Sequence, residues 1–328
     1  MTRCPDFTHL LVLPHLQVQN ANAISSPLTH GFPALTAFVG LMWALERKSR
    51  THGLDLTFKA IGVVCHDHQE QVSDSGYVKT FCLTRNPVGK DGKTAAIVEE
   101  GRIHLDLSLV LAVESERWRR EPDSQMADSK RVAELLATMR IAGGTLLPTP
   151  ETRRHWPYVI DLTGAEQDRQ AEFRKARLRL LPGFTLVARD DLLDRRLDEL
   201  QADNPEATRL DAWLSLSRIN WRYQADGDSS KEGRWVHDRD SLGWVVPIPV
   251  GYGALGELHA PGTVANARDA TTPFRFVESL YSMGEWISPH RLASPQHMLW
   301  YPDSQPENGL YRLRNDYRPA AQYETDFD

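Results

Sequence analysis

The strongest constraint in this chain is a two-residue period of apolar residues over 102–113, with polar residues between them up to Ser108. The apolar positions are Ile103, Leu105, Leu107, Leu109, Leu111 and Val113, and the positions between them begin with Arg102, His104, Asp106 and Ser108. A period of two residues is the signature of a β-strand, because successive side chains of a strand point to opposite faces of the sheet. The segment therefore predicts a strand with one face in the core and the other face polar.

Composition sets the class of protein. A chain of 328 residues suggests about two domains or one domain with large insertions. Its 41% hydrophobic and 25% charged residues are typical of a soluble globular protein, and no apolar run is long enough to span a bilayer. The first residues lack a basic region followed by an apolar core and a small-residue cleavage site, so we expect no secretion, and the three cysteines, Cys4, Cys65 and Cys82, have no paired spacing. We expect a cytoplasmic protein with reduced thiols, no membrane segment and no cofactor.

The first half of the chain predicts the order strand, helix, strand, strand, helix, strand. The expected elements are a strand at residues 9–19, a helix from Pro33, a strand at 56–65, the strand at 102–113, a helix around 132–139 and a short apolar run ending at 148. This is the order of a ferredoxin-like or RRM-like sheet, whose exposed face and loops commonly bind single-stranded RNA. The predicted fold class is therefore α+β, with a ferredoxin-like (RRM-like) core in residues 1–150.

Two segments of this predicted core are polar. Residues 77–99 carry the turn signals Asn86-Pro87 and Asp91-Gly92 between β-prone stretches, which predicts a projecting hairpin within an insertion at about 66–100. Residues 17–33 connect a strand to a helix and are rich in amides and hydroxyls, with two rings near the end: Gln19, Asn20, Asn22, Ser25, Ser26, Thr29, His30 and Phe32. Such side chains suit base edges, phosphates and stacking. The alternative is an ordinary surface connection that caps the helix.

The second half is less regular. It predicts helices at residues 190–202 and 208–219, a mobile loop at 225–233 and an extended segment at 244–249. A further polar cluster contains Asn266, Arg268 and Arg275, which suit phosphate or base contacts, although Arg268 could instead pair with Asp269 or Glu278. Because the net charge is −6, any contact with RNA must be local.

Eight short blocks, in order along the chain, resemble a known family. They lie at residues 19–29 (QNANAISSPLT), 83–87 (LTRNP), 94–102 (TAAIVEEGR), 142–144 (AGG), 179–184 (RLLPGF), 243–252 (GWVVPIPVGY), 266–269 (NARD) and 284–291 (GEWISPHR). Together they are similar to the subunit of the type I-F, or Csy-type, CRISPR surveillance complex that binds the 5′ handle of crRNA. The match covers nearly the whole chain, and departures fall mainly in loops such as residues 118–124.

The resemblance implies a non-catalytic protein of the RAMP superfamily. Its ferredoxin-like core would carry the hairpin as a thumb, and residues 151–328 would form a helical and extended elaboration that packs on the core and on a large subunit. The implied partners are the crRNA handle, the large subunit, an adjacent backbone subunit and target double-stranded DNA near the PAM. Sequence choice would belong to base pairing by the guide.

The resemblance also assigns roles to residues. Handle-lining residues would be Gln19, Asn20, Asn22, Ser25 and Ser26, with His30 and Phe32 close by. Phosphates of the handle would approach Arg140 and the backbone amides of Gly143 and Gly144. The other side of the handle site would be closed by Asn266, Arg268 and Arg275. On the hairpin, the residues expected to contact the first spacer nucleotides or the backbone subunit are Arg85, Asn86, Lys90 and Lys93.

Three other functions compete with this one. Residues 65–68 (CHDH) carry candidate metal ligands, but strand alternation sends Cys65 and Asp67 to one face and the two histidines to the other, so no metal is expected. A RAMP-type ribonuclease that processes CRISPR RNA could use His15, His66 or His104 as an acid or base, although no second catalytic group is evident. A purely structural role could use the aromatic segment 274–300, which includes Trp286 and Trp300.

Overall fold

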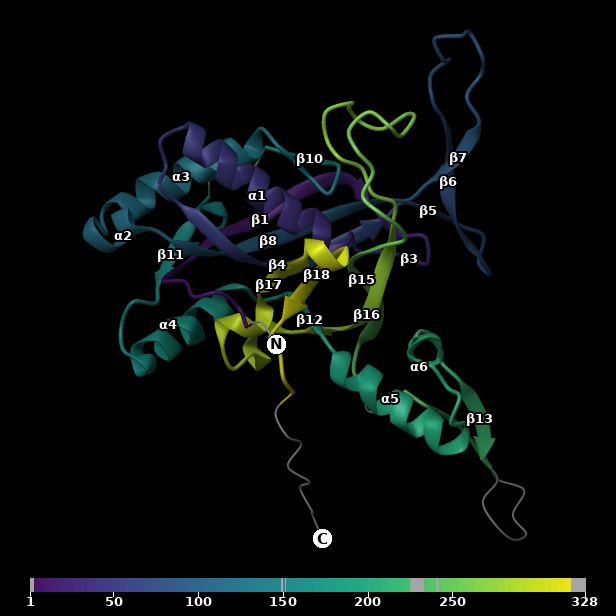
Figure 1. The fold of residues 1–328 in the computed structure, drawn as a ribbon. Coiled ribbons are helices and arrows are strands. Elements are labelled where there is room, and N and C mark those ends of the chain that lie inside the picture. The colour runs from purple at the N-terminus through teal and green to yellow at the C-terminus, as the bar shows by residue number, and fades with distance from the viewer. Residues whose placement is uncertain (1–2, 149, 151, 225–232, 240–241, 320–328) are drawn as a thin grey trace, which may run out of the picture.

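The computed structural model describes residues 3–148, 150, 152–224, 233–239 and 242–319, and it has the predicted α+β class (Figure 1). The elements up to residue 150 are β1 (His9–Asn22), β2 (Ile24–Ser26), β3 (Thr29–His30), α1 (Leu35–Thr51), β4 (Thr57–Glu70), β5 (Val72–Asp74), β6 (Lys79–Arg85), β7 (Ile97–Glu100), β8 (Arg102–Glu114), α2 (Glu116–Arg120), α3 (Ser124–Ala137), β9 (Arg140–Ile141) and β10 (Gly144–Leu146). The later elements are β11 (Tyr158–Asp161), α4 (Glu166–Arg179), β12 (Phe184–Ala188), α5 (Asp190–Asp203), α6 (Arg209–Leu216), β13 (Trp221–Gln224), β14 (Arg234–His237), β15 (Val245–Ala254), β16 (Val277–Ile287), β17 (Trp300–Gln305) and β18 (Leu310–Asn315).

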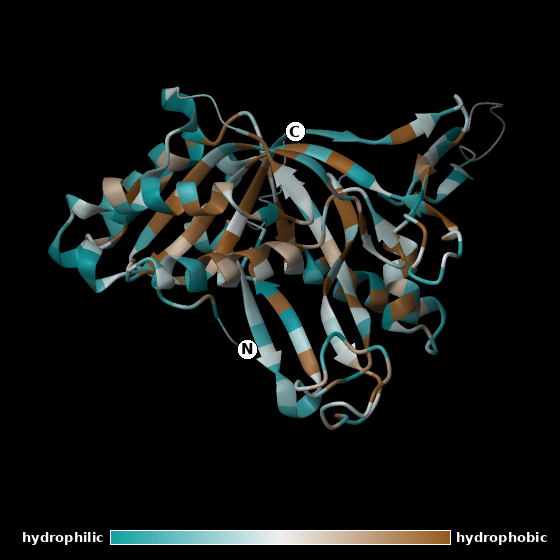
Figure 2. Cartoon of the chain, turned by 90° about the horizontal axis from the view of Figure 1, so that it is seen from above, coloured by the Kyte–Doolittle hydropathy of each residue, from teal (hydrophilic) through white to brown (hydrophobic). Residues whose placement is uncertain are grey.

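Strand β8 lies in the main sheet between β1 and β4, and it pairs antiparallel with both. All six alternating apolar residues from Ile103 to Val113 are buried in one core cluster with α1 and α3. On the opposite face, the side chains are polar up to Ser108, and Val110 and Ala112 then pack against α4 in a second cluster. Figure 2 shows the hydrophobic residues concentrated along the strands and the hydrophilic ones on the outward turns of the helices. The predicted core face is confirmed, whereas the opposite face is polar only up to Ser108, because Val110 and Ala112 are buried in the second cluster.

Helix α1 confirms the helix predicted after Pro33. Its buried stripe follows the spacing of one helical face: Leu35, Phe38, Val39, Met42 and Leu45. Lys48 and Arg50 lie in its last turn, where cations interact favourably with the unpaired carbonyl groups of the helix end. Burial of this stripe against β8 and its neighbours fixes the start of α1, and therefore the path of the polar connection that precedes it.

The main sheet joins strands from both halves of the chain. Its first part has the order β10-β1-β8-β4, and β11 pairs with the other end of β1. The second edge of β4 meets β12 and β17, and the sheet continues through β18, β15 and β16. Strands from before and after residue 150 therefore share one sheet, while the division of the chain at that residue stays a prediction.

The predicted hairpin is present. Strands β6 and β7 pair antiparallel with Arg85 opposite Ile97, and the ribbon projects from the body of the protein (Figure 1). The hairpin is exposed along nearly all of its length. Its base adjoins the C-terminal part of β4 through β5, which pairs with β6.

A separate lobe follows β12 and contains α5, α6, β13 and β14 (Figure 1). Helix α5 matches the prediction closely, but α6 ends at Leu216, three residues before the predicted end. A capping box starts α6: Asp211 and Thr208 bond each other's backbone N–H groups. The expected extended segment at 244–249 lies largely in β15, whereas most of the predicted mobile loop at 225–233 lies outside the described residues. Among the described helices, none has the length and apolarity needed to cross a membrane.

Candidate nucleic-acid interface

A cavity of about 600 Å³ lies between the C-terminal part of β4, the start of α1 and strand β15. It exists because β12 pairs with β4 only at Val64 and Cys65, and no described strand pairs with residues 66–70 on that side. The rings that line the cavity are His30, Phe32, His66, His68, Phe184, Trp244 and Trp286. Further polar lining comes from Ser25, Asp67, Glu70 and Lys79. Aromatic walls with a few polar groups are typical of a pocket for a small planar molecule or a base.

The aromatic walls are held by contacts with each other. Phe32 stacks on Phe38 with ring centroids 5.6 Å apart and meets the edge of Trp286 at 4.8 Å. Trp244 lies 5.8 Å from Phe184 and 6.2 Å from Trp286. Trp244 and Phe184 are still 52% and 44% exposed, so each offers ring surface to a ligand. These two rings suit stacking on a base.

The polar connection forms one wall of the cavity and is internally bonded. The hydroxyls of Ser25 and Ser26 each lie 2.7 Å from Thr29 Oγ1, and Ser26 is buried. His30 Nδ1 lies 3.1 Å from Glu70 Oε1, which ties the loop to β4. Ser25, His30 and Phe32 therefore line the cavity, whereas Ser26 shapes the β2–β3 turn behind it.

The amide side chains lie at the polar end of β1. Gln19, Asn20 and Asn22 are all exposed there. Asn20 has a left-handed backbone (φ 56°) within an irregularity of the β1–β8 pairing, and its N–H donates to Nδ1 of His104 at 3.1 Å. The Asn22 side chain donates to the carbonyl of Ile24 at 2.8 Å. A bulge of this kind redirects side chains at a strand end, so these amides face outward beside the sheet.

A glycine turn meets the same strand end. Gln19 is the partner of Thr145 in the β1–β10 pairing, and Asn22 N–H donates to the carbonyl of Ala142 at 2.9 Å. Gly144 must be glycine, because a Cβ there would lie 2.7 Å from the backbone N of Ala21. Arg140 is exposed, and Gly143 is exposed with φ 79°. The structure therefore brings Gln19, Asn20 and Asn22 together with Arg140, Gly143 and Gly144.

The hairpin residues form a separate group. Arg85, Asn86, Lys90 and Lys93 are all exposed beyond the paired part of the hairpin or at its end. Lys93 pairs loosely with Asp91 at 3.5 Å. The hairpin extends to the same end of the molecule as the loop between β15 and β16 (Figure 1). Only its base, through Lys79, reaches the cavity.

In the polar cluster between β15 and β16, one predicted residue is hydrogen-bonded to the protein and the other two are exposed. Arg275 is half-buried, and its guanidinium donates to the carbonyl of Pro306 at 3.3 Å. Asn266 (φ 58°) and Arg268 are exposed, and Arg268 makes no ion pair within the described residues. Asp269 instead accepts the N–H groups of Thr271 and Thr272, which lowers its pKa to about 2. The alternative pairing of Arg268 with Asp269 or Glu278 is absent from the described part of the chain.

Comparison with known proteins decides the family. A family model described as CRISPR-associated protein (Cas_Csy2) matches residues 11–313. This chain belongs to the Csy2 family. It is 47% identical over 312 residues to the CRISPR-associated protein Csy2 of Pseudomonas aeruginosa strain UCBPP-PA14, with 92% of this chain and 94% of the relative covered.

In this Csy2-family chain, two of the three histidines named as possible catalysts, His15 and His66, belong to one hydrogen-bonded network, whereas His104 accepts the backbone N–H of Asn20 at Nδ1. His15 Nδ1 lies 3.1 Å from the Asp106 carboxylate, and its Nε2 accepts from Arg154 at 2.9 Å. Because arginine is always protonated, this contact leaves the His15 proton on Nδ1. Both ring nitrogens of His15 therefore already have protein partners.

His66 stacks on His15 at 4.1 Å and is bound in the same way. Its Nδ1 lies 2.6 Å from the carbonyl of Pro182, which can only accept, so the other nitrogen accepts from Ser108 at 2.7 Å. Burial lowers the pKa of His66 below its usual value. His66 also lines the cavity, but both its nitrogens are used to join β4, β8 and the segment before β12.

Sequence reasoning missed the two exposed rings of the cavity. Phe184 follows a Pro-Gly pair and Trp244 follows a glycine, so each sits where the chain leaves a turn and enters a strand. Aromatic residues next to turn signals were the available clue, although nothing in the sequence places them beside β4. The Cys65 to His68 run meets an irregularity of the β4–β8 pairing, and no group of three metal-binding side chains occurs among the described residues.

Proposed function

We propose that this chain is a subunit of a type I-F, or Csy-type, CRISPR surveillance complex that holds the 5′ handle of crRNA without cutting it. The observation that carries the proposal is the direct pairing of Gln19 with Thr145. This pairing puts the amides of β1 and the amide groups of the glycine turn on one edge. The cavity adjoins it through the connection that carries Ser25, His30 and Phe32. Membership of the Csy2 family supports the assignment to such a complex.

The physical basis is recognition of a single strand through several kinds of contact. Exposed amides can bond base edges, and the backbone N–H groups near Gly143, with Arg140, suit phosphate oxygens. A base that enters the cavity would stack on Trp244 or Phe184, each of which has free ring surface. Since the chain carries a net charge of −6, these local contacts must replace a broad basic surface.

The proposal includes the fold and the partners. The sheet order β10-β1-β8-β4, with α1 in the connection from β1 to β4 and α3 in the connection from β8 to β10, supports a ferredoxin-like core of the RAMP type. We keep residues 151–328 as the elaboration that packs on this core and on the large subunit. The exposed hairpin would contact the adjacent backbone subunit or first spacer nucleotides, and target DNA near the PAM would enter beside the large subunit in the cytoplasm.

The test is binding of the handle RNA by the purified chain over a range of salt concentrations. Arg140→Ala and Arg268→Ala should each lower the slope of log affinity against log salt by about 0.7, the value for one phosphate contact of a single strand. Gln19→Ala should weaken binding without changing the slope, because an amide carries no charge. Arg131→Ala is the matched control, since Arg131 is exposed but pairs with Glu134 at 2.8 Å. If Arg140→Ala, Arg268→Ala and Gln19→Ala all leave the affinity and the salt slope unchanged, these residues do not contact the handle.

The same reactions separate this function from a RAMP-type ribonuclease. Both ring nitrogens of His15 and of His66 already have protein partners, which argues against these two histidines as the acid and base of a cleavage reaction. We therefore expect RNA recovered from the binding reactions to keep its length. Site-specific cleavage of a CRISPR precursor that is abolished by His66→Gln would require the enzyme instead.

A further inference from the structure

The lobe that follows β12 carries an exposed ladder of aromatic rings. Strands β13 and β14 form a two-stranded sheet of their own, here called the aromatic ribbon. Trp221 lies opposite His237 and Tyr223 opposite Trp235, so alternation puts all four rings on one face. Ring centroids are 4.6 Å apart in the first pair and 5.6 Å apart in the second. Trp221, Tyr223 and Trp235 are 58%, 53% and 64% exposed.

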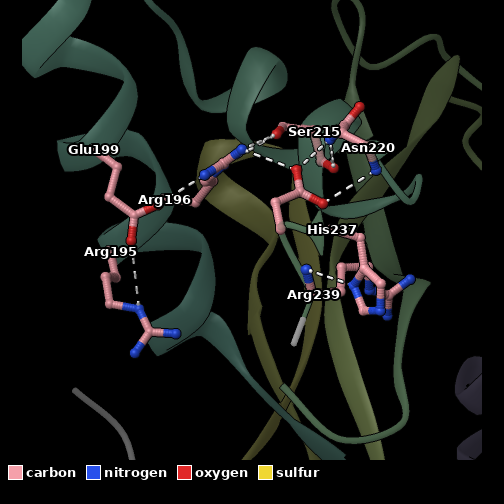
Figure 3. Close-up of polar contacts among 8 residues, drawn as sticks. Arg195, Arg196, Glu199, Ser215, Asn220, His237 and Arg239 are labelled. Atoms are coloured by element: carbon pink, nitrogen blue, oxygen red, sulfur yellow. Dashed lines mark hydrogen bonds and ion pairs between the residues drawn. The ribbon is translucent and has the colours of Figure 1, made fainter. Parts of the chain in front are cut away.

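The ribbon is fixed at its base. Asp238, directly after β14, accepts the backbone N–H of Asn220 at 3.1 Å and a guanidinium N–H of Arg196 at 3.2 Å. Arg196 also donates to Ser215 and Glu199, so one side chain ties α5, α6 and the ribbon together (Figure 3). The exposed rings are therefore presented by an anchored element, even though two-stranded ribbons are only marginally stable alone.

The charges beside the rings are unpaired and positive. Arg218, Arg222 and Arg234 are exposed, and none of them makes an ion pair or a side-chain hydrogen bond with a described residue. By contrast, Arg195 and Arg196 on α5 are both paired with carboxylates. A lobe that pairs both arginines of α5 with carboxylates but leaves three arginines without such partners near a row of rings is complementary to a ligand with flat apolar faces and negative charge.

We propose that the aromatic ribbon is a stacking platform for a single strand of nucleic acid, separate from the handle site. Bases would stack on Trp221, Tyr223 and Trp235, and phosphates at the edges of the ribbon would meet the long arginine side chains. Arg222 and Arg234 lie on the face opposite the rings, and an arginine side chain is long enough to bring its guanidinium group to the edge of a two-stranded ribbon. The platform lies at the other end of the molecule from the hairpin (Figure 1). Stacking of a base on an aromatic ring does not depend on the 2′-hydroxyl of the sugar, so single-stranded RNA and DNA should bind with similar affinity.

The experiment measures the fluorescence anisotropy of labelled oligothymidylate and oligouridylate, each of about 16 nucleotides, with the full-length chain. Trp221→Ala and Trp235→Ala should each weaken binding of both probes by about tenfold, the lower part of the range for loss of one stacked base. Leu210→Ala is the control, because Leu210 is a 59% exposed apolar residue of the same lobe outside the ribbon. Arg222→Gln and Arg234→Gln should reduce the salt slope, whereas Arg195→Gln should not. Thermal unfolding of each variant checks that the chain still folds.

Specific outcomes would overturn the proposal. If a triple variant that lacks all three exposed rings binds both probes like the unaltered chain, the ribbon is not a platform. If the ring variants keep their affinity for the probes but lose copurification with the other subunits, the ribbon is a protein-docking surface. Excess handle RNA should leave the probes bound, because that RNA belongs to the other end of the molecule. Full displacement would mean one shared site, and it would contradict this inference while leaving the proposed handle function intact.

Discussion

The cavity beside β4 and the aromatic ribbon both present tryptophan rings, but the two regions support them differently. In the cavity, Trp244 contacts Phe184 and Trp286, and Phe32 packs between Trp286 and the buried Phe38. In the ribbon, the ring contacts given by the structure are the two cross-strand pairs, Trp221 with His237 and Tyr223 with Trp235. A site whose walls belong to the core can fix the position of one base, whereas an open ladder suits sequence-tolerant stacking.

A large effect is expected from breaking the buried ion pair that joins the lobe of the ribbon to the main sheet. Arg189, just before α5, pairs with Glu285 of β16, and their side chains are only 12% and 6% exposed. Glu285→Ala leaves this arginine largely buried with only the more exposed Asp191 as partner, so we expect the free energy of unfolding to fall by about 3 kcal/mol. Denaturant unfolding measures this loss.

The control for that variant is Asp194→Ala, which breaks an exposed pair with Arg209 within the lobe. A surface pair contributes less than about 1 kcal/mol, so the unfolding midpoint of the control should stay close to that of the unaltered chain. Equal midpoints for Glu285→Ala and Asp194→Ala would show that the buried pair does not hold the lobe to the sheet.

The next effect tests the cavity against the ribbon directly. Trp244→Ala removes one half-exposed wall, and it should weaken binding of handle RNA by about 1–3 kcal/mol, the range for one base stacked on an aromatic ring. Binding of oligothymidylate should not change, because that probe is assigned to the ribbon. Trp43→Ala provides the matched control on α1, where Trp43 is 37% exposed and outside the cavity. Loss of both ligands in Trp244→Ala would contradict the separation of the sites.

The sequence predicted the parts of the fold that follow from periodicity. Strand β8 and helix α1 have apolar positions at periods of 2 and 3.6 residues, and both lie close to where those periods place them. Turn signals alone were enough to locate the hairpin. These features are local, so no knowledge of distant contacts was needed.

The candidate site depended on contacts that periodicity does not encode. The amides of β1 were predicted from composition, but their position follows from the left-handed backbone of Asn20 and the close approach of Gly144 to Ala21. Phe184 and Trp244 reach the cavity only because β12 and β15 join the sheet beyond β4. His15 was a candidate acid or base in the sequence, yet strand pairing places Asp106 beside its ring and Ser108 beside its backbone N–H.

A smaller effect should appear when the pH is lowered. Burial lowers the pKa of His66 in the folded protein, so the unfolded chain takes up a proton first as the pH falls below about 6.5. The stability that neutral His66 contributes to the folded protein is therefore fully present above about pH 6.5. It is lost as the pH falls from that value toward the lower pKa that His66 has in the folded state. Melting temperatures should fall between about pH 7.5 and pH 5.5, and His66→Gln should make this decline shallower.

The control for the pH series is His68→Gln. His68 is exposed and its ring makes no hydrogen bond within the described residues, so this variant should keep the slope of the unaltered protein. Burial also lowers the pKa of His9 and His297, and the decline in His66→Gln should therefore be reduced and not abolished. An unchanged slope in His66→Gln would mean that the network around the cavity does not depend on the charge of this histidine.

The smallest expected effect is the most direct measure of the contrast between the two regions. Trp235 is 64% exposed on the ribbon, so Trp235→Ala should change the free energy of unfolding by no more than about 0.5 kcal/mol. Phe38 supports the cavity wall and is fully buried, so Phe38→Ala should cost about 3–5 kcal/mol. Urea unfolding of the two variants gives both values. A ring whose removal weakens binding of a single strand but leaves stability intact is held for a ligand, whereas a large loss of stability from Trp235→Ala would make the ladder part of the folded core.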